Sequence, residues 1–116
     1  MNAEIFIGLN PINKLYFLNK VKMSEPNSII DIACDLLNSP RDEVIGKSRK
    51  REIVECRHIA MGVIRHNTLT TLKEIGKLFN RDHSSVIYAI ENFKDLYGRD
   101  KEFTKKADMV KLSTNK

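Results

Sequence analysis

Residues 71–90 read TLKEIGKLFNRDHSSVIYAI, and the order of local signals in this stretch decides the fold. Thr71 followed by Glu74 forms a capping box, which predicts a short helix through Phe79. The segment Asn80-Arg81-Asp82 reads as a turn, and Asp82 can cap a longer helix. The apolar residues of that helix recur at helical spacing, at Val86, Ile90, Phe93 and Tyr97. The stretch therefore predicts a short helix, a tight turn and a longer helix.

Gly76 supports this pairing of helices. It lies midway along the short helix, where glycine costs about 1 kcal/mol of helix propensity. A residue without a side chain at that position lets the two helices approach closely. An ordinary helical hairpin would tolerate the same glycine, so topology alone does not distinguish a hairpin from a DNA-binding motif.

Helical patterns continue on both sides of the motif. Ser28 and Asp31 form a capping pattern, which predicts a helix over residues 28–38. A second helix follows the cluster Lys47-Ser48-Arg49-Lys50-Arg51. Its apolar face consists of Ile53, Cys56, Ala60, Val63 and Ile64, and its other faces carry Arg57, His58 and Arg65.

Gly98 ends the longer motif helix, and a last helix follows Asp100. Its inward residues are Phe103, Ala107 and Val110, and the polar tail from Ser113 is expected to fray. No internal repeat is present. The predicted fold is all-α. Residues 28–112 form a small helical domain that contains a helix-turn-helix.

Residues 1–27 form an N-terminal extension to which the pattern assigns no function. Ile5, Ile7 and Leu9 alternate as in a short strand, and Asn10-Pro11 breaks that alternation. The extension could pack on the core, stay mobile, or be an upstream extension of a shorter natural product that begins at Met23.

Length and composition bound the class of protein. The 116 residues, 41% of them hydrophobic, suffice for one domain, and 20 Lys and Arg against 15 Asp and Glu favour a polyanionic partner. No apolar run is long enough to span a membrane, and the start lacks a signal peptide's positive region, so we expect a cytoplasmic, nucleoid-associated protein. Cys34 and Cys56 read as reduced core thiols. The spacing of Cys56, His58 and His66 matches no zinc pattern, so we expect no metal and no cofactor.

Two segments carry side chains suited to nucleic acid. Asp82-His83-Ser84-Ser85 places short polar groups at the helix end that would enter a major groove, although Asp82 and the serines could be caps alone. The cluster from Lys47 to Arg51 could reach a narrow, A·T-rich minor groove, although charge runs are usually solvated loops.

These residues carry a family resemblance. Ile59-Ala-Met61, Leu72-x-Glu-Ile-Gly76, Phe79 and Arg81-Asp-His-Ser-Ser-Val86 resemble the C-terminal DNA-binding domain of the bacterial replication initiator DnaA, over about residues 28–110. The resemblance implies a Trp-repressor-like helical domain that binds the asymmetric, A·T-containing DnaA box as a monomer.

The resemblance also implies which residues touch DNA. The family's minor-groove arginine corresponds to Arg49. Its major-groove or backbone contacts correspond to Arg57, Arg65, Leu72, Lys73, Asp82, His83, Ser84 and Ser85. Lys47, Arg51 and Arg81 complete the predicted set. The chain departs from the family pattern at Asn80, where the turn is one residue shorter, and at Cys56 and Lys73, where proline is common.

No G-x-x-x-x-G-K-[ST] phosphate loop occurs, and 116 residues leave no room for the initiator's ATPase domain. Paired carboxylates and an activated nucleophile are also lacking, so we predict no enzymatic activity and no ATP binding. The predicted function is specific binding of double-stranded DNA in replication control or transcription regulation, with other replication or regulatory proteins as candidate partners. The alternative is a protein-interaction module that keeps the fold but not specific DNA binding.

Overall fold

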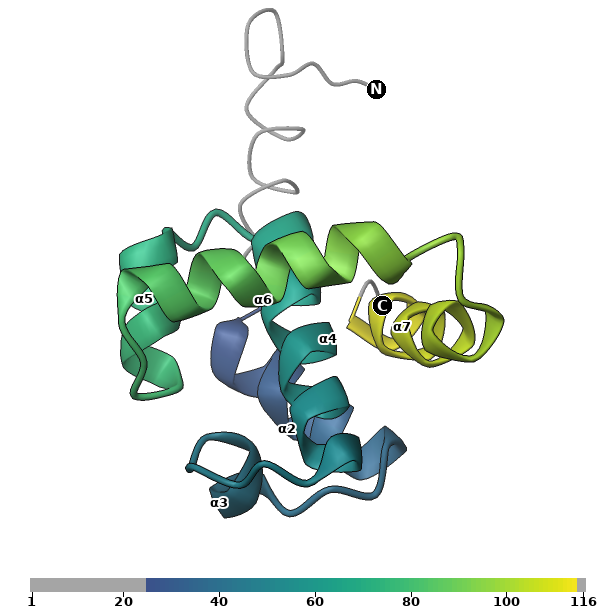
Figure 1. Ribbon diagram of the computed structural model, residues 1–116, viewed down its shortest axis with the longest axis horizontal. Helices are drawn as coiled ribbons and strands as arrows, with labels where there is room; N and C mark the ends of the chain where they lie inside the picture. The colour runs from purple at the N-terminus through teal and green to yellow at the C-terminus, as the bar shows by residue number, and fades with distance from the viewer. Residues whose placement is uncertain (1–24, 115–116) are drawn as a thin grey trace, which may run out of the picture.

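The computed structural model describes residues 25–114, and in that range the chain forms six α-helices and no strand (Figure 1). The helices are α2 (Pro26–Leu36), α3 (Arg41–Val44), α4 (Arg51–Asn67), α5 (Leu72–Leu78), α6 (His83–Leu96) and α7 (Lys101–Thr114). The all-α prediction is confirmed. The possible strand at Ile5 to Leu9 lies outside the described residues.

Helix α4 is the centre of the fold. It packs against α2, α6 and α7, and α6 crosses over it with α5 at one end and α7 near the other (Figure 1). Every residue of α4 from Cys56 to Ile64 is buried. At Gly62, an added Cβ would lie 2.3 Å from Cγ of Phe93 on α6, so this glycine permits the close crossing of the two helices.

The first helix starts two residues earlier than predicted. Glu25 is the N-cap residue and Pro26 opens the first turn of α2, so the predicted cap at Ser28 is wrong. Proline suits a first turn because its missing N–H would have no partner there. The four-residue helix α3 was not predicted, because one turn is too short to give a periodic pattern. Arg41 ties it to α2, since Arg41 Nη2 donates to Asn27 Oδ1 at 2.8 Å.

Helix α7 matches the prediction on its buried face but not at its C-terminal end. The inward residues Phe103, Ala107 and Val110 are buried, as predicted. The tail does not fray at Ser113, however, because α7 continues through Thr114. Asn67 Nδ2, at the end of α4, donates to Thr114 Oγ1 at 2.8 Å, and this bond anchors the last turn.

The two cysteines are free thiols in the core, between α2 and α4. Burial raises the pKa of Cys56 to about 12, so this thiol stays protonated at neutral pH. Among residues 25–114, no helix is both long and apolar enough to cross a membrane.

Candidate nucleic-acid interface

Helices α5 and α6 and the turn between them form the predicted helix-turn-helix. The capping box is present, since Thr71 Oγ1 accepts from the Glu74 N–H at 3.1 Å and Glu74 Oε1 accepts from the Thr71 N–H at 2.9 Å. A Cβ on Gly76 would lie 2.6 Å from the Arg81 carbonyl oxygen and 3.6 Å from Val86 Cγ2. Gly76 therefore faces the turn more closely than it faces α6. Asn80 completes the turn with φ 54°, in the left-handed region.

The first turn of α6 presents its polar side chains to solvent. Asp82 Oδ1 accepts from the Ser85 N–H at 2.8 Å, which confirms the predicted cap. Hydrogen bonding from the Ser85 backbone lowers the pKa of Asp82, so its carboxylate is ionised at neutral pH. His83, Ser84 and Ser85 are exposed. The N-terminal end of α6, which would enter a groove, is thus capped by Asp82 while its polar side chains remain accessible to solvent.

Residues 46–50, here called the basic loop, connect α3 to α4. Lys47, Arg49 and Lys50 are exposed, and Arg51 follows as the first, exposed residue of α4. Lys50 lies 3.8 Å from Glu43 Oε1, a distance at which an exposed pair contributes little. The charged groups of these side chains are therefore available to a polyanion.

The sequence suggested that Arg57 lies on an outer face of α4, but it does not. It is buried, with 5% of its surface exposed. Arg57 Nε donates to the Val44 carbonyl at 2.7 Å, and Nη2 donates to the carbonyls of Glu43 at 3.1 Å and Ser48 at 3.0 Å. The predicted outward placement of Arg57 was wrong because these backbone acceptors, at and after the end of α3, take the place of water around the guanidinium group.

Arg81 binds the same region from the other side. Its Nη2 donates to the Gly46 carbonyl at 2.7 Å, and its Nη1 donates to the Phe79 carbonyl at 2.7 Å. Gly46 also accepts from Arg57 Nη2 at 3.4 Å. The turn before α6 and the basic loop are thus joined directly, although 35 residues separate Arg81 from Gly46.

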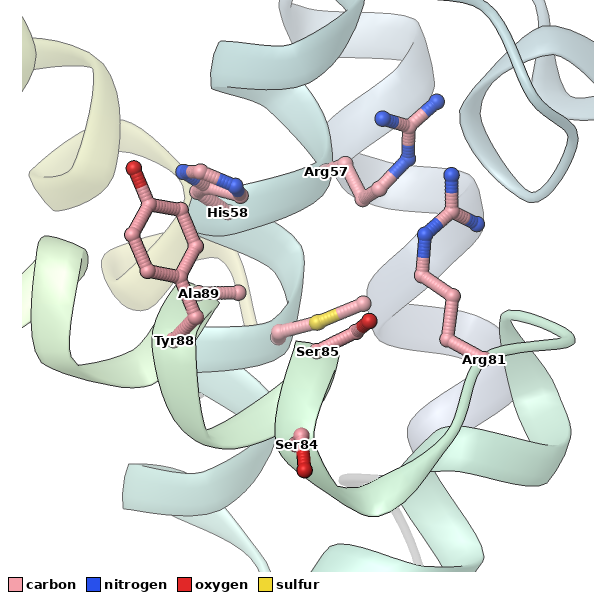
Figure 2. Close-up of a pocket in the computed structure, with 8 residues that line it drawn as sticks. Arg57, His58, Arg81, Ser84, Ser85, Tyr88 and Ala89 are labelled. Atoms are coloured by element: carbon pink, nitrogen blue, oxygen red, sulfur yellow. The ribbon is translucent and has the colours of Figure 1, made fainter.

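A hollow of about 350 Å³ lies between α4 and the first turns of α6 (Figure 2). The two guanidinium groups extend side by side on one side of it, and His58 and Tyr88 lie on the other. The complete lining is Arg57, His58, Met61, Arg81, Ser84, Ser85, Tyr88 and Ala89.

His58 is also buried, contrary to the sequence analysis. Burial, and then the charges of Arg57 and Arg81, lower its pKa, so the ring is neutral at pH 7. Asn92 Nδ2 donates to His58 Nδ1 at 2.8 Å, which requires that ring nitrogen to be unprotonated. His58 therefore acts as a fixed, uncharged wall of the hollow.

Tyr88 was missed by the sequence analysis. It is 68% exposed, and its ring meets His58 edge-on with the ring centroids 6.0 Å apart. The signal was present in the sequence, because Tyr88 lies four residues after Ser84 and outside the apolar stripe of Val86 and Ile90. An aromatic side chain thus continues the polar surface of the first turn along α6.

The remaining predicted site residues lie around the start of α5. Arg65 is exposed, and its Nη1 donates to the Thr70 carbonyl at 3.1 Å. Lys73 is exposed. Leu72 is half-buried and packs against the core, so it would reach a ligand mainly through its backbone.

Charge is concentrated in the same part of the chain. Residues 46–85 contain nine Lys and Arg and four Asp and Glu, a net charge of +5. The whole chain also carries +5, so the rest is electrically balanced. The excess positive charge that favours a polyanion lies in the basic loop, α4 and the helix-turn-helix. Within residues 25–114 no cluster of three His, Cys, Asp or Glu side chains could hold a metal ion.

Sequence similarity links this chain to a known family. Residues 26–92 match the family described as the bacterial dnaA protein helix-turn-helix. The chain is 39% identical over 98 residues to the chromosomal replication initiator protein DnaA of Deinococcus deserti, covering 84% of this chain and 21% of the relative. It is 39% identical over 80 residues to that of Thermus thermophilus, covering 68% and 18%, and 35% identical over 82 residues to that of Leptospira biflexa, covering 69% and 18%. The chain spans about a fifth of the length of these curated relatives.

Proposed function

Because the chain belongs to the family of the bacterial DnaA helix-turn-helix, a DNA-binding domain, we propose that it reads a specific double-stranded site resembling the DnaA box. In this proposal α6 enters the major groove with its first turn, and Arg49 of the basic loop enters the adjacent minor groove. We further propose that one monomer occupies one site.

The observation that carries the proposal is the exposed first turn of α6 next to the basic loop. His83, Ser84 and Ser85 offer donors and acceptors at the helix N-terminus, where the helix dipole also favours phosphate. The Arg81 bond to Gly46 holds the basic loop beside the turn that precedes α6. One rigid unit thus presents two elements of different character to one duplex.

Position in the fold and side-chain chemistry divide the predicted contacts into base-edge and phosphate contacts. We assign base-edge contacts to Asp82, His83, Ser84 and Ser85, and phosphate contacts to the exposed cations and the start of α5, namely Lys47, Arg51, Arg65, Lys73 and the Leu72 backbone. Tyr88 is added to this surface because its exposed ring and hydroxyl continue it along α6.

We propose that the output is replication control or transcription regulation, because the similar proteins are replication initiators. The 116 residues contain no phosphate loop, so the proposed role needs no nucleotide hydrolysis by this domain. We therefore expect the domain to be non-enzymatic.

The test compares Arg49→Ala and His83→Ala with wild type on single-base variants of a DnaA-like box, at several salt concentrations. His83→Ala should weaken binding by about 1 to 3 kcal/mol and relax discrimination at one or two positions, because a base-edge contact is local. Arg49→Ala should weaken the preference for A·T pairs at one end of the site and lower the salt dependence by about one counterion.

Arg99→Ala is the matched control for Arg49→Ala. Arg99 is an exposed arginine beyond the C-terminal end of α6, far along the chain from the first turn, so its loss should leave sequence preference unchanged. Equal loss for Arg49→Ala and His83→Ala on every sequence would reduce both residues to phosphate contacts. No preference of the wild type for the box over scrambled duplex would favour a protein-interaction module instead.

A further inference from the structure

We infer that Arg81 is a positioning residue for the basic loop rather than a DNA contact, and that it sets the placement of Arg49 relative to α6. This inference rests on the proposed function, in which Arg49 and the first turn of α6 read one site. Arg81 holds these two parts of the interface, which are distant in sequence, at a fixed separation.

Two donors of Arg81 are engaged within the protein. Nη1 binds the Phe79 carbonyl of the turn and Nη2 binds the Gly46 carbonyl of the basic loop, both at 2.7 Å. The planar guanidinium group presents these donors in a fixed fork, so it specifies the distance between the two backbones. Asp82, the next residue, caps α6 and transmits that placement to the helix.

Arg57 secures the same loop from the side of α4. Its bonds to the Val44 and Glu43 carbonyls hold the end of α3, and its bond to the Ser48 carbonyl holds the middle of the basic loop. Gly46 accepts from both arginines. Backbone carbonyls, rather than a carboxylate, therefore surround two neighbouring cations on either side of one loop.

The like charges of Arg57 and Arg81 repel each other. The pKa of Arg57 is lowered by burial and then by the charge of Arg81. Both cations stay beside the loop because the carbonyls of Gly46 and Ser48 accept from them. Lys47, Arg49 and Lys50 are exposed, so their side chains contribute little burial to the order of the loop.

Fixing the loop before DNA arrives reduces the entropy lost on binding, because an unanchored segment must be ordered when it meets the groove. Without Arg81, the loop would keep only its bonds to Arg57, so Arg49 would approach the minor groove from a wider range of positions. The energetic effect of Arg49 on binding should then depend on Arg81, although the two side chains contact different partners.

The test is a double-mutant cycle that combines Arg81→Lys with Arg49→Ala on a DnaA-like box. Lysine keeps the charge but has no planar fork, so it cannot hold both carbonyls in the same way. Arg81→Lys should weaken box binding by roughly ten- to hundredfold. Adding Arg49→Ala should then cost much less than it costs in wild type, whereas adding His83→Ala should keep its full effect.

Arg65→Lys is the matched control, because Arg65 also donates to a backbone carbonyl but lies away from the basic loop. In that background Arg49→Ala should keep its full effect. A second measurement needs no DNA. In ¹⁵N relaxation of the free protein, the amides of residues 46–50 should lose order in Arg81→Lys and keep it in Arg65→Lys.

An unchanged effect of Arg49→Ala in the Arg81→Lys background, together with an unchanged order of the loop, would overturn the inference while box binding still supported the proposed function. If wild type shows no preference for the box, the proposed function fails. The relaxation measurement then decides separately whether Arg81 positions the loop.

Discussion

Replacing Gly62 with alanine adds a single methyl group at the crossing of α4 and α6. The new Cβ would lie 2.3 Å from Cγ and 2.4 Å from Cδ2 of Phe93. Relief to an ordinary contact of 3.4 Å requires the ring to move by about 1.1 Å. Phe93 is 8% exposed, stacks on Tyr97 with centroids 5.5 Å apart and meets Phe103 edge-on at 5.6 Å, so the ring has little room to move.

Two opposing terms set the magnitude. Overpacking a core costs about 1 to 3 kcal/mol, and alanine recovers about 1 kcal/mol of helix propensity relative to glycine. Because a rigid ring rather than a flexible side chain must yield, we expect the upper part of the overpacking range. The net loss should be about 1 to 2 kcal/mol, which lowers the melting temperature by roughly 4 to 15 °C in a domain of this size.

Urea denaturation followed by far-ultraviolet circular dichroism measures this loss, and Phe93→Leu tests its cause. Leucine removes part of the ring, so the double variant should be more stable than the sum of the single effects predicts, by at least about 1 kcal/mol. Gly98→Ala is the control, because no atom lies within 4 Å of its Cβ and its φ of +88° strains only the backbone. Its effect should add to that of Phe93→Leu. Additive effects for Gly62→Ala and Phe93→Leu would refute the packing argument.

Three further predictions concern the interface. Asp82→Ala should lower the melting temperature more than Asp82→Asn, because asparagine still accepts from the Ser85 N–H and caps α6; equal losses would show that charge, not the cap, stabilises the helix. Burial lowers the pKa of His58 from its usual 6.5. As pH falls, the unfolded chain therefore takes up a proton at this ring before the folded protein does. The free energy of unfolding should fall as pH drops from about 6.5 towards the folded-state pKa. His58→Gln should flatten the melting temperature measured across that window, and an equally steep curve would contradict the burial argument. Tyr88→Ala should weaken box binding by about tenfold with stability changed by less than about 0.5 kcal/mol, and Tyr88→Phe tells whether the hydroxyl or the ring is responsible; normal binding by both would remove Tyr88 from the interface.

Local signals account for the parts of the fold that the sequence predicted well. The capping box of Thr71 and Glu74 and the Asp82 cap involve groups three residues apart, so their geometry follows from the residues themselves. The apolar stripes of α6 and α7 likewise report their buried faces directly, at Val86, Ile90, Phe103 and Ala107.

Non-local contacts explain what the sequence could not predict. A charged residue in a helical pattern reads as outward, yet Arg57 is buried because carbonyls 9 to 14 residues earlier in the chain surround its guanidinium group. The bond from Arg81 to Gly46 spans 35 residues, and Gly62 faces a ring on another helix. No spacing rule within one segment contains these relations, and they determine how the interface is held together.

Competition binding to a duplex with a DnaA-like box and to a scrambled duplex of equal composition, at about 0.15 M salt, tests the proposed function most directly. Specific recognition predicts that the box binds at least about a thousandfold more tightly than the scrambled duplex. Equal affinity for the two duplexes, with the same salt dependence, would mean that the domain binds DNA only through charge and would contradict the proposal that α6 and the basic loop read a sequence.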